Sequence, residues 1–438
     1  MLSSEGYCMS MSSLARQAGM SETEWKQAVK FDSTDWGWIV MSIGMAIGAG
    51  IVFLPVQVGL VGVWVFLLSA LIAYPSIYLL QRLFINTLAD SPDCNDYPSV
   101  ISGYLGKNWG FLLGILYFMM SLICVFMYST ALTNDSASFL QSFGVTDGLL
   151  SDSPWYGLAV ICFMVVIASR GEKLLFKVST LMVLTKLCVV ACLGLLMVQS
   201  WDLANIGAFP DFGYILKQTI IMLPYTLTSI IFIPSLSPMV ISYRSHHKSI
   251  YVARYKALRA MKIAFLVLFV TIFSYALSFN LAMGHEQAVE AYTHNISALA
   301  MVAKGADGDV VKIFSLVLNI FAVVTAYFSV FLGFKEACTG IAINLLSRAL
   351  PAEKINRERV ATGILVFAVA VSWGAIVLNA PILKLLSFLG PILGCIGCLI
   401  PAYLVYKVAS LRQYKGAVLN LIVFSGVLLV VSPFIAMI

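Results

Sequence analysis

The chain has 438 residues, of which 60% are hydrophobic and only 11% are charged, and its mean hydropathy is +0.93. These values exclude an ordinary soluble globular protein. The formal net charge of +6 does not require a nucleic-acid partner, because the basic residues follow a pattern that membrane topology explains.

Residues 1–35 are polar and of mixed charge. They contain no short apolar core of the kind that a cleavable signal peptide carries. We therefore expect a cytoplasmic N-terminal tail over residues 1–35, followed by a single transmembrane domain over residues 36–438.

Apolar runs long enough to cross about 30 Å of hydrocarbon recur from Trp36 to the C-terminus. They predict an all-α integral membrane protein with eleven transmembrane helices. We expect these helices near residues 36–59, 63–84, 110–132, 155–169, 178–199, 220–241, 263–283, 313–334, 362–379, 385–406 and 418–436.

The lysines and arginines test this map independently. If the N-terminus is cytoplasmic, the inward loops and the tail hold 22 of the 27 basic residues, and the outward loops hold Lys217, Lys304, Lys312 and Lys384. This asymmetry is the positive-inside pattern, so we expect a cytoplasmic N-terminus and, with eleven spans, a periplasmic C-terminus. The basic run 244–262 also allows a lipid or nucleic-acid patch, but a topology determinant with a cytoplasmic connecting helix is the simpler interpretation.

The first predicted span carries Gly48, Ala49 and Gly50 at mid-depth and Pro55 farther along. Glycine has low helix propensity, and proline lacks an N–H and clashes with the preceding turn, so this helix is expected to break inside the bilayer. A broken backbone at that depth is tolerated only where protein or an internal cavity surrounds it. The alternative is a packing face for a neighbouring helix, formed by Gly44 and Gly48.

A break at this place would create two complementary binding surfaces. The outer half-helix would begin with free N–H groups near Gly48, Ala49 and Gly50, which suit a carboxylate. The inner half-helix would end with unpaired carbonyls near Ala46 and Ile47, which suit an ammonium group. One break can thus hold both ends of a zwitterion.

The sixth predicted span contains a second candidate break, Ile233-Pro-Ser-Leu-Ser-Pro238. Because proline cannot donate a hydrogen bond, we expect free carbonyls near Phe232 and Ile233, with the hydroxyls of Ser235 and Ser237 facing a small polar substrate. The alternative is a proline kink repaired by the neighbouring serines.

Interrupted helices at corresponding positions of two five-helix halves are typical of transporters built from inverted repeats, with the substrate site at the midplane. We therefore expect a first repeat over residues 36–200, a second repeat over residues 220–406, and one extra helix over residues 418–436.

Lys186 is the only Lys, Arg, Asp or Glu deep within the predicted helices. A lysine at that depth costs roughly 2.5–3.5 kcal/mol on insertion scales, and such residues usually face a pathway or a partner. We expect Lys186 to exchange a proton and, when charged, to bridge to carbonyls near the first break. Thr325 and Ser329, one turn apart on the eighth helix, are its candidate neighbours, and the alternative for Lys186 is a partial snorkel toward the interface or a static strut.

Signatures of enzymes and metal sites are weak in this sequence. The four histidines fall in predicted loops, and Cys395 and Cys398 fit small packing residues better than half of a metal motif. We find no catalytic triad, no nucleotide-binding loop and no paired buried carboxylates. We therefore expect neither an enzyme nor an ATP-driven pump, and neither a metal nor a cofactor.

Three stretches resemble the bacterial hydroxy and aromatic amino acid permeases of the amino acid–polyamine–organocation superfamily, most of all their serine/threonine branch. They are residues 45–55 (Met-Ala-Ile-Gly-Ala-Gly-Ile-Val-Phe-Leu-Pro), the serine–proline stretch of the sixth helix, and residues 390–403 (Gly-Pro-Ile-Leu-Gly-Cys-Ile-Gly-Cys-Leu-Ile-Pro-Ala-Tyr). The resemblance covers nearly the whole chain after residue 30. It implies a LeuT-like fold of five plus five inverted helices and one extra helix. It also implies proton-coupled import of serine, threonine or a close analogue across a bacterial inner membrane by alternating access.

Carried over by position, the resemblance assigns roles to single residues. Ala49 and Gly50 would offer N–H groups to the substrate carboxylate, and Ala46 with a carbonyl near Ile233 would take the ammonium group. Lys186 matches the lysine that replaces sodium in proton-coupled members.

The sixth helix departs from the serine branch, which carries a histidine or asparagine near the break. An aromatic amino acid permease is therefore the alternative within the family. A non-transporting amino-acid sensor and a channel are the alternatives from other classes.

Overall fold

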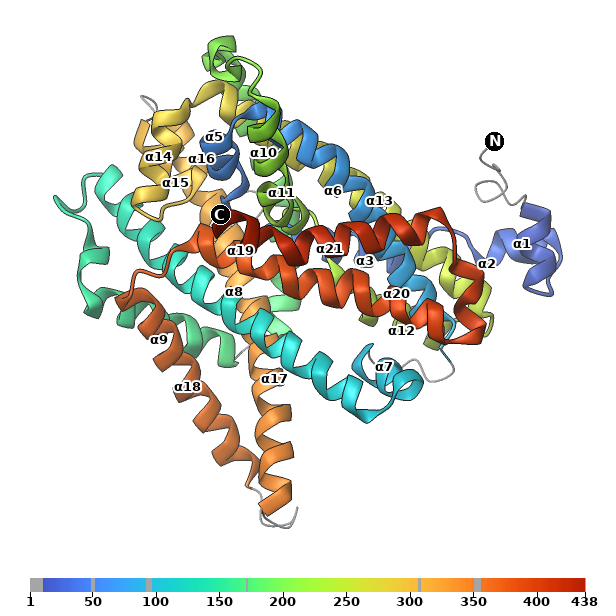
Figure 1. Ribbon diagram of the computed structural model, residues 1–438. Helices are drawn as coiled ribbons and strands as arrows, with labels where there is room; N and C mark the ends of the chain where they lie inside the picture. Colours follow the sequence, from blue (N-terminus) through green and yellow to red (C-terminus); the bar gives the residue numbers. More distant parts are fainter. Residues whose placement is uncertain are drawn as a thin grey trace.

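The computed structural model describes residues 11–48, 52–91, 97–170, 172–305, 309–349 and 356–437, and every regular element in these ranges is a helix (Figure 1). Within them, eight helices are long and apolar enough to cross a bilayer. A ninth span results if the bent pair α11 (Phe212–Thr228) and α12 (Ile233–His246) counts as one. The predicted class of an all-α multi-pass membrane protein is confirmed, and the count of eleven spans stays a prediction.

The first part of the chain runs from the N-terminal helices to the long helix that precedes residue 200. Its α-helices are α1 (Met11–Gln17), α2 (Glu22–Ala28), α3 (Ser33–Ala46), α5 (Leu54–Val61), α6 (Val63–Ala89), α7 (Tyr97–Leu105), α8 (Lys107–Ser142), α9 (Pro154–Arg170) and α10 (Glu172–Met197). Short 3₁₀ turns follow α8 and α10, namely η1 (Leu150–Asp152), η2 (Val198–Ser200) and η3 (Leu203–Ile206).

The second part begins with the bent pair. It continues with α13 (Ile250–Ala282), α14 (His285–Thr293), α15 (Ala298–Gly305), α16 (Asp309–Asn319), α17 (Thr325–Ala349), α18 (Arg357–Val377), α19 (Ile382–Leu393), α20 (Ile400–Lys407) and α21 (Ala417–Met437). The π-helical segments η4 (Ile320–Val324) and η6 (Gly394–Leu399) join α16 to α17 and α19 to α20, and the 3₁₀ turn η7 (Ala409–Tyr414) precedes α21.

The third predicted helix is longer than expected. We expected it to end at residue 132 and an outer loop to follow, whereas α8 continues to Ser142. The residues that resembled a loop, among them Thr133, Asn134, Asp135 and Ser138, are buried. Polar residues of this kind favour turns when they are solvated, but here Asn134 and Asp135 bind residues outside α8, and the Thr133 hydroxyl donates to Ser129 O within the helix.

The expected N-terminal tail is partly folded. Ser21 and Asp32 begin α2 and α3 as capping boxes, with Glu24 and Asp35 reaching back to the cap backbone. A separate small apolar cluster holds α1 and α2 against the start of α13; its buried members are Ala15, Trp25, Val29 and Val252. The segment before the first span therefore packs on the helical domain.

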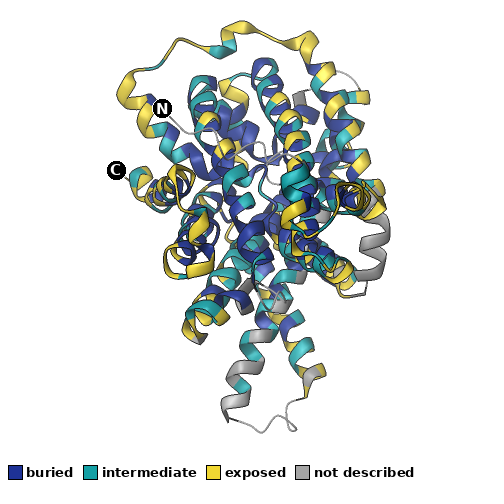
Figure 2. Cartoon of the chain, turned by 90° about the vertical axis from the view of Figure 1, so that its right-hand side faces the viewer, coloured by how far each residue is buried: buried dark blue, intermediate teal, exposed yellow. Residues whose placement is uncertain are grey.

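Buried residues gather in the interior of the bundle, and exposed residues lie on its outside (Figure 2). Many exposed side chains are large and apolar, such as Leu71, Leu195 and Leu378. An apolar exterior of this extent suits lipid rather than water. In Figure 1, α21 runs from the side that carries α1 and α2 toward the side that carries α5 and α14.

Candidate functional site

The first span is interrupted where the glycines predicted a break. α3 ends at Ala46, Ile47 leaves the helical conformation with φ −72° and ψ 89°, and α5 begins at Leu54 with Pro55 in its first turn. Proline is tolerated in a first turn, because the N–H it lacks would have no intrahelical partner there. Val52 N donates a hydrogen bond to Gly48 O at 3.1 Å. Ala49 and Gly50, predicted to face the carboxylate, lie outside the described residues.

Gly48 lies where other helices approach closely. A Cβ added at this position would lie 2.9 Å from Tyr128 Oη on α8 and 3.2 Å from Ala326 Cβ on α17. Only glycine fits here without a shift of its neighbours. The alternative interpretation, a glycine packing face, therefore describes part of the arrangement, and it coexists with the interruption.

The second interruption lies one turn earlier than predicted. α11 ends at Thr228 and α12 begins at Ile233, with the two axes bent by 41°. We placed the break within residues 233–238, but Pro234 occupies the first turn of α12 and Pro238 lies inside it. Proline marks the beginning of the second half-helix here, because its fixed φ suits a helix start.

The exposed backbone of the second interruption is held by side chains. Phe232 N donates to Gln81 Oε1 of α6 at 3.1 Å, and both residues are buried. Phe232 O accepts hydrogen bonds from Ser235 N at 3.0 Å and from Ser235 Oγ at 2.9 Å. The carbonyl of Phe232 is thus engaged in this conformation, in contrast to the free carbonyl that we expected.

A hydroxyl pair joins the two broken spans. Ser235 Oγ lies 2.9 Å from Ser42 Oγ on α3, and both side chains are fully buried. The half-helices α3 and α12 therefore contact each other directly through polar groups. Ser237 is half-buried. Ile233 approaches Gly397 closely, because a Cβ added at Gly397 would lie 3.2 Å from Ile233 Cδ1.

Lys186 on α10 meets the first interruption. Its side chain is fully buried, and Nζ donates a hydrogen bond to Ile47 O at 3.3 Å. Ile47 O is one of the last carbonyls of the inner half-helix, which has no following turn to satisfy it. The predicted neighbours Thr325 and Ser329 lie in the first turns of α17, and their side chains are outside the described part.

Three buried polar residues in this region, Ser42, Gln81 and Tyr128, were not predicted from the sequence, and neither was the buried Asp135 elsewhere on α8. Gln81 was detectable, because a glutamine deep inside an apolar helix needs a partner. Asp135 was missed because the third helix was ended too early.

An ionic cluster joins the start of α3 to α12 and α13. Asp35 of α3 is fully buried and accepts hydrogen bonds from Tyr243 Oη of α12 at 2.6 Å and from Arg259 Nη2 of α13 at 2.8 Å. Lys256 of α13 lies 3.4 Å from Asp35 and 2.5 Å from Asp32. Partial burial alone would raise the pKa of Asp32, but hydrogen bonds, first of all from Lys256, hold it below its usual value.

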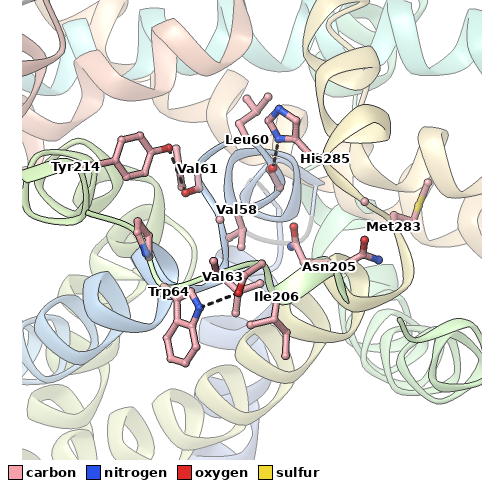
Figure 3. A pocket seen from close by; sticks show the side chains of 17 residues that line it. Val58, Leu60, Val61, Val63, Trp64, Asn205, Ile206, Tyr214, Met283 and His285 are labelled. Carbon is pink, nitrogen blue, oxygen red and sulfur yellow. Dashed lines mark hydrogen bonds between the residues drawn. The ribbon is translucent and has the colours of Figure 1, made fainter. Parts of the chain in front are cut away.

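A cavity of about 300 Å³ lies at the outer ends of α5, α6, α13 and α14 (Figure 3). His285 Nδ1 lies 2.8 Å from Gly59 O in its wall, and Trp64 Nε1 donates to Gly207 O at 3.4 Å. The residues of the two interruptions do not line it. It is therefore distinct from the predicted substrate site.

The described residues contain no group of three or more His, Cys, Asp or Glu side chains placed to hold a metal ion. Cys395 and Cys398 lie in the π-helical segment η6, and a Cβ at Gly426 of α21 would approach Cys398 Cβ to 2.6 Å. Cys398 thus packs tightly against a neighbouring helix.

Comparison with known proteins gives the family. No protein-family model matches the chain. It is 65% identical to a probable serine transporter of Escherichia coli K12 and 64% identical to a serine transporter of Escherichia coli O157:H7, in each case over 437 residues and 99% of both chains. It is 24% identical to the threonine/serine transporter TdcC of Yersinia enterocolitica over 409 residues, which are 87% of this chain and 91% of that one. The chain belongs to the serine/threonine permease branch of the bacterial hydroxy and aromatic amino acid permeases.

Proposed function

We propose that this protein is a proton-coupled symporter that imports serine, threonine or a close small hydroxy amino acid across the bacterial inner membrane by alternating access. The observation that carries the proposal is the contact of Lys186 with Ile47 O at the interruption of the first span. The names of the relatives, serine transporter and threonine/serine transporter, support the substrate class and favour it over aromatic amino acids.

The proposed architecture is eleven spans in a five-plus-five inverted repeat. If α3 with α5 is the first span and α11 with α12 the sixth, the packing partners correspond under a shift of five spans. The first span packs on α13, which is the seventh span. In the same way, the sixth span packs on α6, which is the second span. Similarly, α8 packs on α19 as α16 packs on α10. A repeat related by a two-fold axis requires this exchange of partners, which supports the proposed LeuT-like fold.

In the proposed site the substrate lies between the two interruptions. Its carboxylate faces the N–H groups of Gly48, Ala49 and Gly50, which precede the outer half-helix in the chain and lie where a helix dipole favours negative charge. Its ammonium group faces the C-terminal end of α3 near Ala46 and Ile47, with the region of Ile233 opposite. Ser235 and Ser237 supply hydroxyls from the first turns of α12.

Lys186 carries the proton in this proposal. When charged, its ammonium group donates a charge-assisted hydrogen bond to Ile47 O, which ties α10 to the end of the inner half-helix α3. When Lys186 gives up its proton, that bond weakens to one between neutral partners. The inner half-helix is then released toward the cytoplasm, and the proton leaves with the substrate on the same side.

Uptake into proteoliposomes tests the proposal. We expect labelled serine to accumulate when an inward pH gradient is imposed in sodium-free buffer, and to stop accumulating when a protonophore collapses the gradient. Excess unlabelled threonine should compete for uptake, whereas tryptophan should not. An absolute requirement for sodium, or accumulation that ignores the gradient, would refute proton coupling.

A further inference from the structure

A buried carboxylate lies outside the site described above. Asp135 is fully buried on the outer part of α8. Its Oδ1 accepts a hydrogen bond from Ser297 N at 2.8 Å, and its Oδ2 accepts one from Asn319 Nδ2 at 2.6 Å. Ionisable residues buried inside membrane-spanning bundles are costly and usually functional.

These contacts join three elements. Ser297 immediately precedes α15, which forms a two-helix cover with α14 at the outer side of the bundle (Figure 1). Asn319 is the last residue of α16, directly before the π-helical segment η4. We call α14 and α15 the outer lid. Asp135 therefore fastens the outer lid to α8 and α16.

The outer lid in turn rests on the outer half of the first broken span. α14 packs on α5, and a Cβ at Gly59 would approach Ala288 Cβ to 2.5 Å. His285 at the start of α14 lies 2.8 Å from Gly59 O through its Nδ1. Any loosening of the outer lid therefore reaches the half-helix beside the proposed carboxylate site.

The hydrogen-bonding partners around Asp135 favour an ionised carboxylate. Ser297 N and Asn319 Nδ2 are amide N–H groups, which can only donate, and the Ser297 side chain also hydrogen-bonds to the carboxylate. Ser297 Oγ already accepts from Asn319 Nδ2 at 2.9 Å and from Ala300 N at 3.1 Å. In a protonated carboxyl group, the O–H of one oxygen would point at one of the two amide donors. The hydrogen bond from that donor to Asp135 would then be lost.

The charged and titratable groups on the surrounding elements do not compensate this carboxylate. None of the described basic side chains hydrogen-bonds to Asp135. Lys304 and Glu290 of the outer lid pair with each other at the surface. The other such groups on the outer parts of these elements are half-buried or exposed, except Tyr327, which is buried on α17; they are Tyr156, His285, Glu286, Tyr292, His294, Asp309, Lys312 and Lys384.

We propose that Asp135 is a second proton-binding residue of the transport cycle, and that its protonation from the outer solution releases the outer lid and opens the site outward. Deprotonation refastens the lid through Ser297 N and Asn319 Nδ2. The inference rests on the proposed transport function, but it concerns the lid and can be tested without transport.

Hydrogen exchange measured by mass spectrometry on the purified protein in lipid nanodiscs tests the inference. After correction for the intrinsic rate, we expect amides of residues 297–305 to exchange on the order of tenfold faster at pH 5.5 than at pH 8, because one hydrogen bond to a charged group is lost. Asp135→Asn places an amide N–H against the same donors, so exchange should be fast at both pH values.

Asn134→Ala is the matched control. Asn134 Nδ2 donates to the lid backbone at Asn295 O at 3.4 Å without any titratable group. This variant should raise exchange at both pH values and keep the ratio between them. Asn319→Ala, which retains the carboxylate but removes its Oδ2 donor, should reduce the ratio, and it serves as a second test if Asp135→Asn does not fold.

The outcomes separate the two proposals. A wild-type lid whose exchange does not depend on pH, or an Asp135→Asn or Asn319→Ala protein that keeps the wild-type ratio, overturns the role of Asp135. Serine uptake driven by a pH gradient would stand in that case. Uptake that needs sodium, together with a pH-dependent lid, would instead refute proton coupling and leave the lid inference intact.

Discussion

At the scale of single residues, the first interruption depends on groups that satisfy its backbone. Lys186 is fully buried and donates to Ile47 O, a carbonyl that a continuous helix would have satisfied itself. The lysine is thus both a stabiliser of the broken backbone and a group that can change charge. In the proposed cycle, a single proton at this position alters how firmly α3 is held.

Replacing this lysine separates accumulation from binding. In Lys186→Met we expect gradient-driven serine accumulation to fall roughly tenfold or more, because a hydrogen bond from a charged group is lost at the break. Serine binding, followed by thermal shift, should change much less. Lys304→Met at the surface is the control and should transport normally. Wild-type accumulation by Lys186→Met would return this lysine to a static role.

Gly48 provides a second residue-scale prediction. An alanine Cβ there would lie 2.9 Å from Tyr128 Oη and 3.2 Å from Ala326 Cβ, so α3, α8 and α17 could not keep their present separation. Overpacking of this kind costs about 1–3 kcal/mol. We expect Gly48→Ala to reduce the initial rate of serine uptake at normal expression. Gly114→Ala, where the added Cβ has no atom within 4 Å, should leave the rate unchanged.

At the scale of elements, the inner ends of the broken spans are fastened by charge. Asp35 of α3 binds Tyr243 of α12 and Arg259 of α13, and Arg259 Nη1 also donates to Val29 O at 2.6 Å in the folded N-terminal segment. The cluster therefore ties both inner half-helices and this segment to one long helix. In the proposed cycle, opening toward the cytoplasm has to disturb this cluster.

Removing the charge of Asp35 should lower stability strongly. Breaking a buried ion pair from one side costs about 3–5 kcal/mol, because the partner charge stays buried. We expect Asp35→Asn to lower the midpoint of thermal denaturation in detergent. Glu290→Gln, which breaks the exposed pair with Lys304, should cost less than about 1 kcal/mol. Equal shifts in the two variants would argue against a structural role for the buried cluster.

The sequence predicted elements whose signals are local. The first break was predicted from the low helix propensity of its glycines. The partner contact of Lys186 was predicted from the cost of placing a charge in lipid. The extension of α8 could not be predicted in this way. Asp135 is held by Ser297 and Asn319, which are far away in the chain. Local composition cannot predict partners at such a distance in sequence. The second break was placed one turn late, because Pro234 marks a helix start as readily as a helix break.

At the scale of the whole molecule, the path of α21 across the bundle is what an odd number of crossings requires if the folded N-terminal segment is cytoplasmic (Figure 1). The asymmetry of the basic residues supports the same orientation. In the repeat proposed above, the half-helices α3 and α12 lie at one end of the bundle. Their counterparts α5 and α11 lie at the other end.

Fusions at the two termini test this topology. Alkaline phosphatase joined after Met437 should be active, because it would be exported, and a fluorescent protein joined at the same place should stay dark. The reverse pair of results is expected for fusions placed in the loop between α12 and α13, which carries His247 and Lys248. An inactive phosphatase at the C-terminus would mean an even number of crossings.

The length of α8 has a mechanical consequence. Its 36 residues extend about 54 Å, whereas the hydrocarbon layer measures about 30 Å, so the helix has to tilt steeply or protrude. Its outer turns bear the fastening of the outer lid, and its middle touches Gly48. A thicker bilayer would reduce the tilt of α8 and would move its contact with the outer lid and its contact with Gly48 together. The acyl-chain length of the host membrane thereby becomes a determinant of how easily the lid lifts.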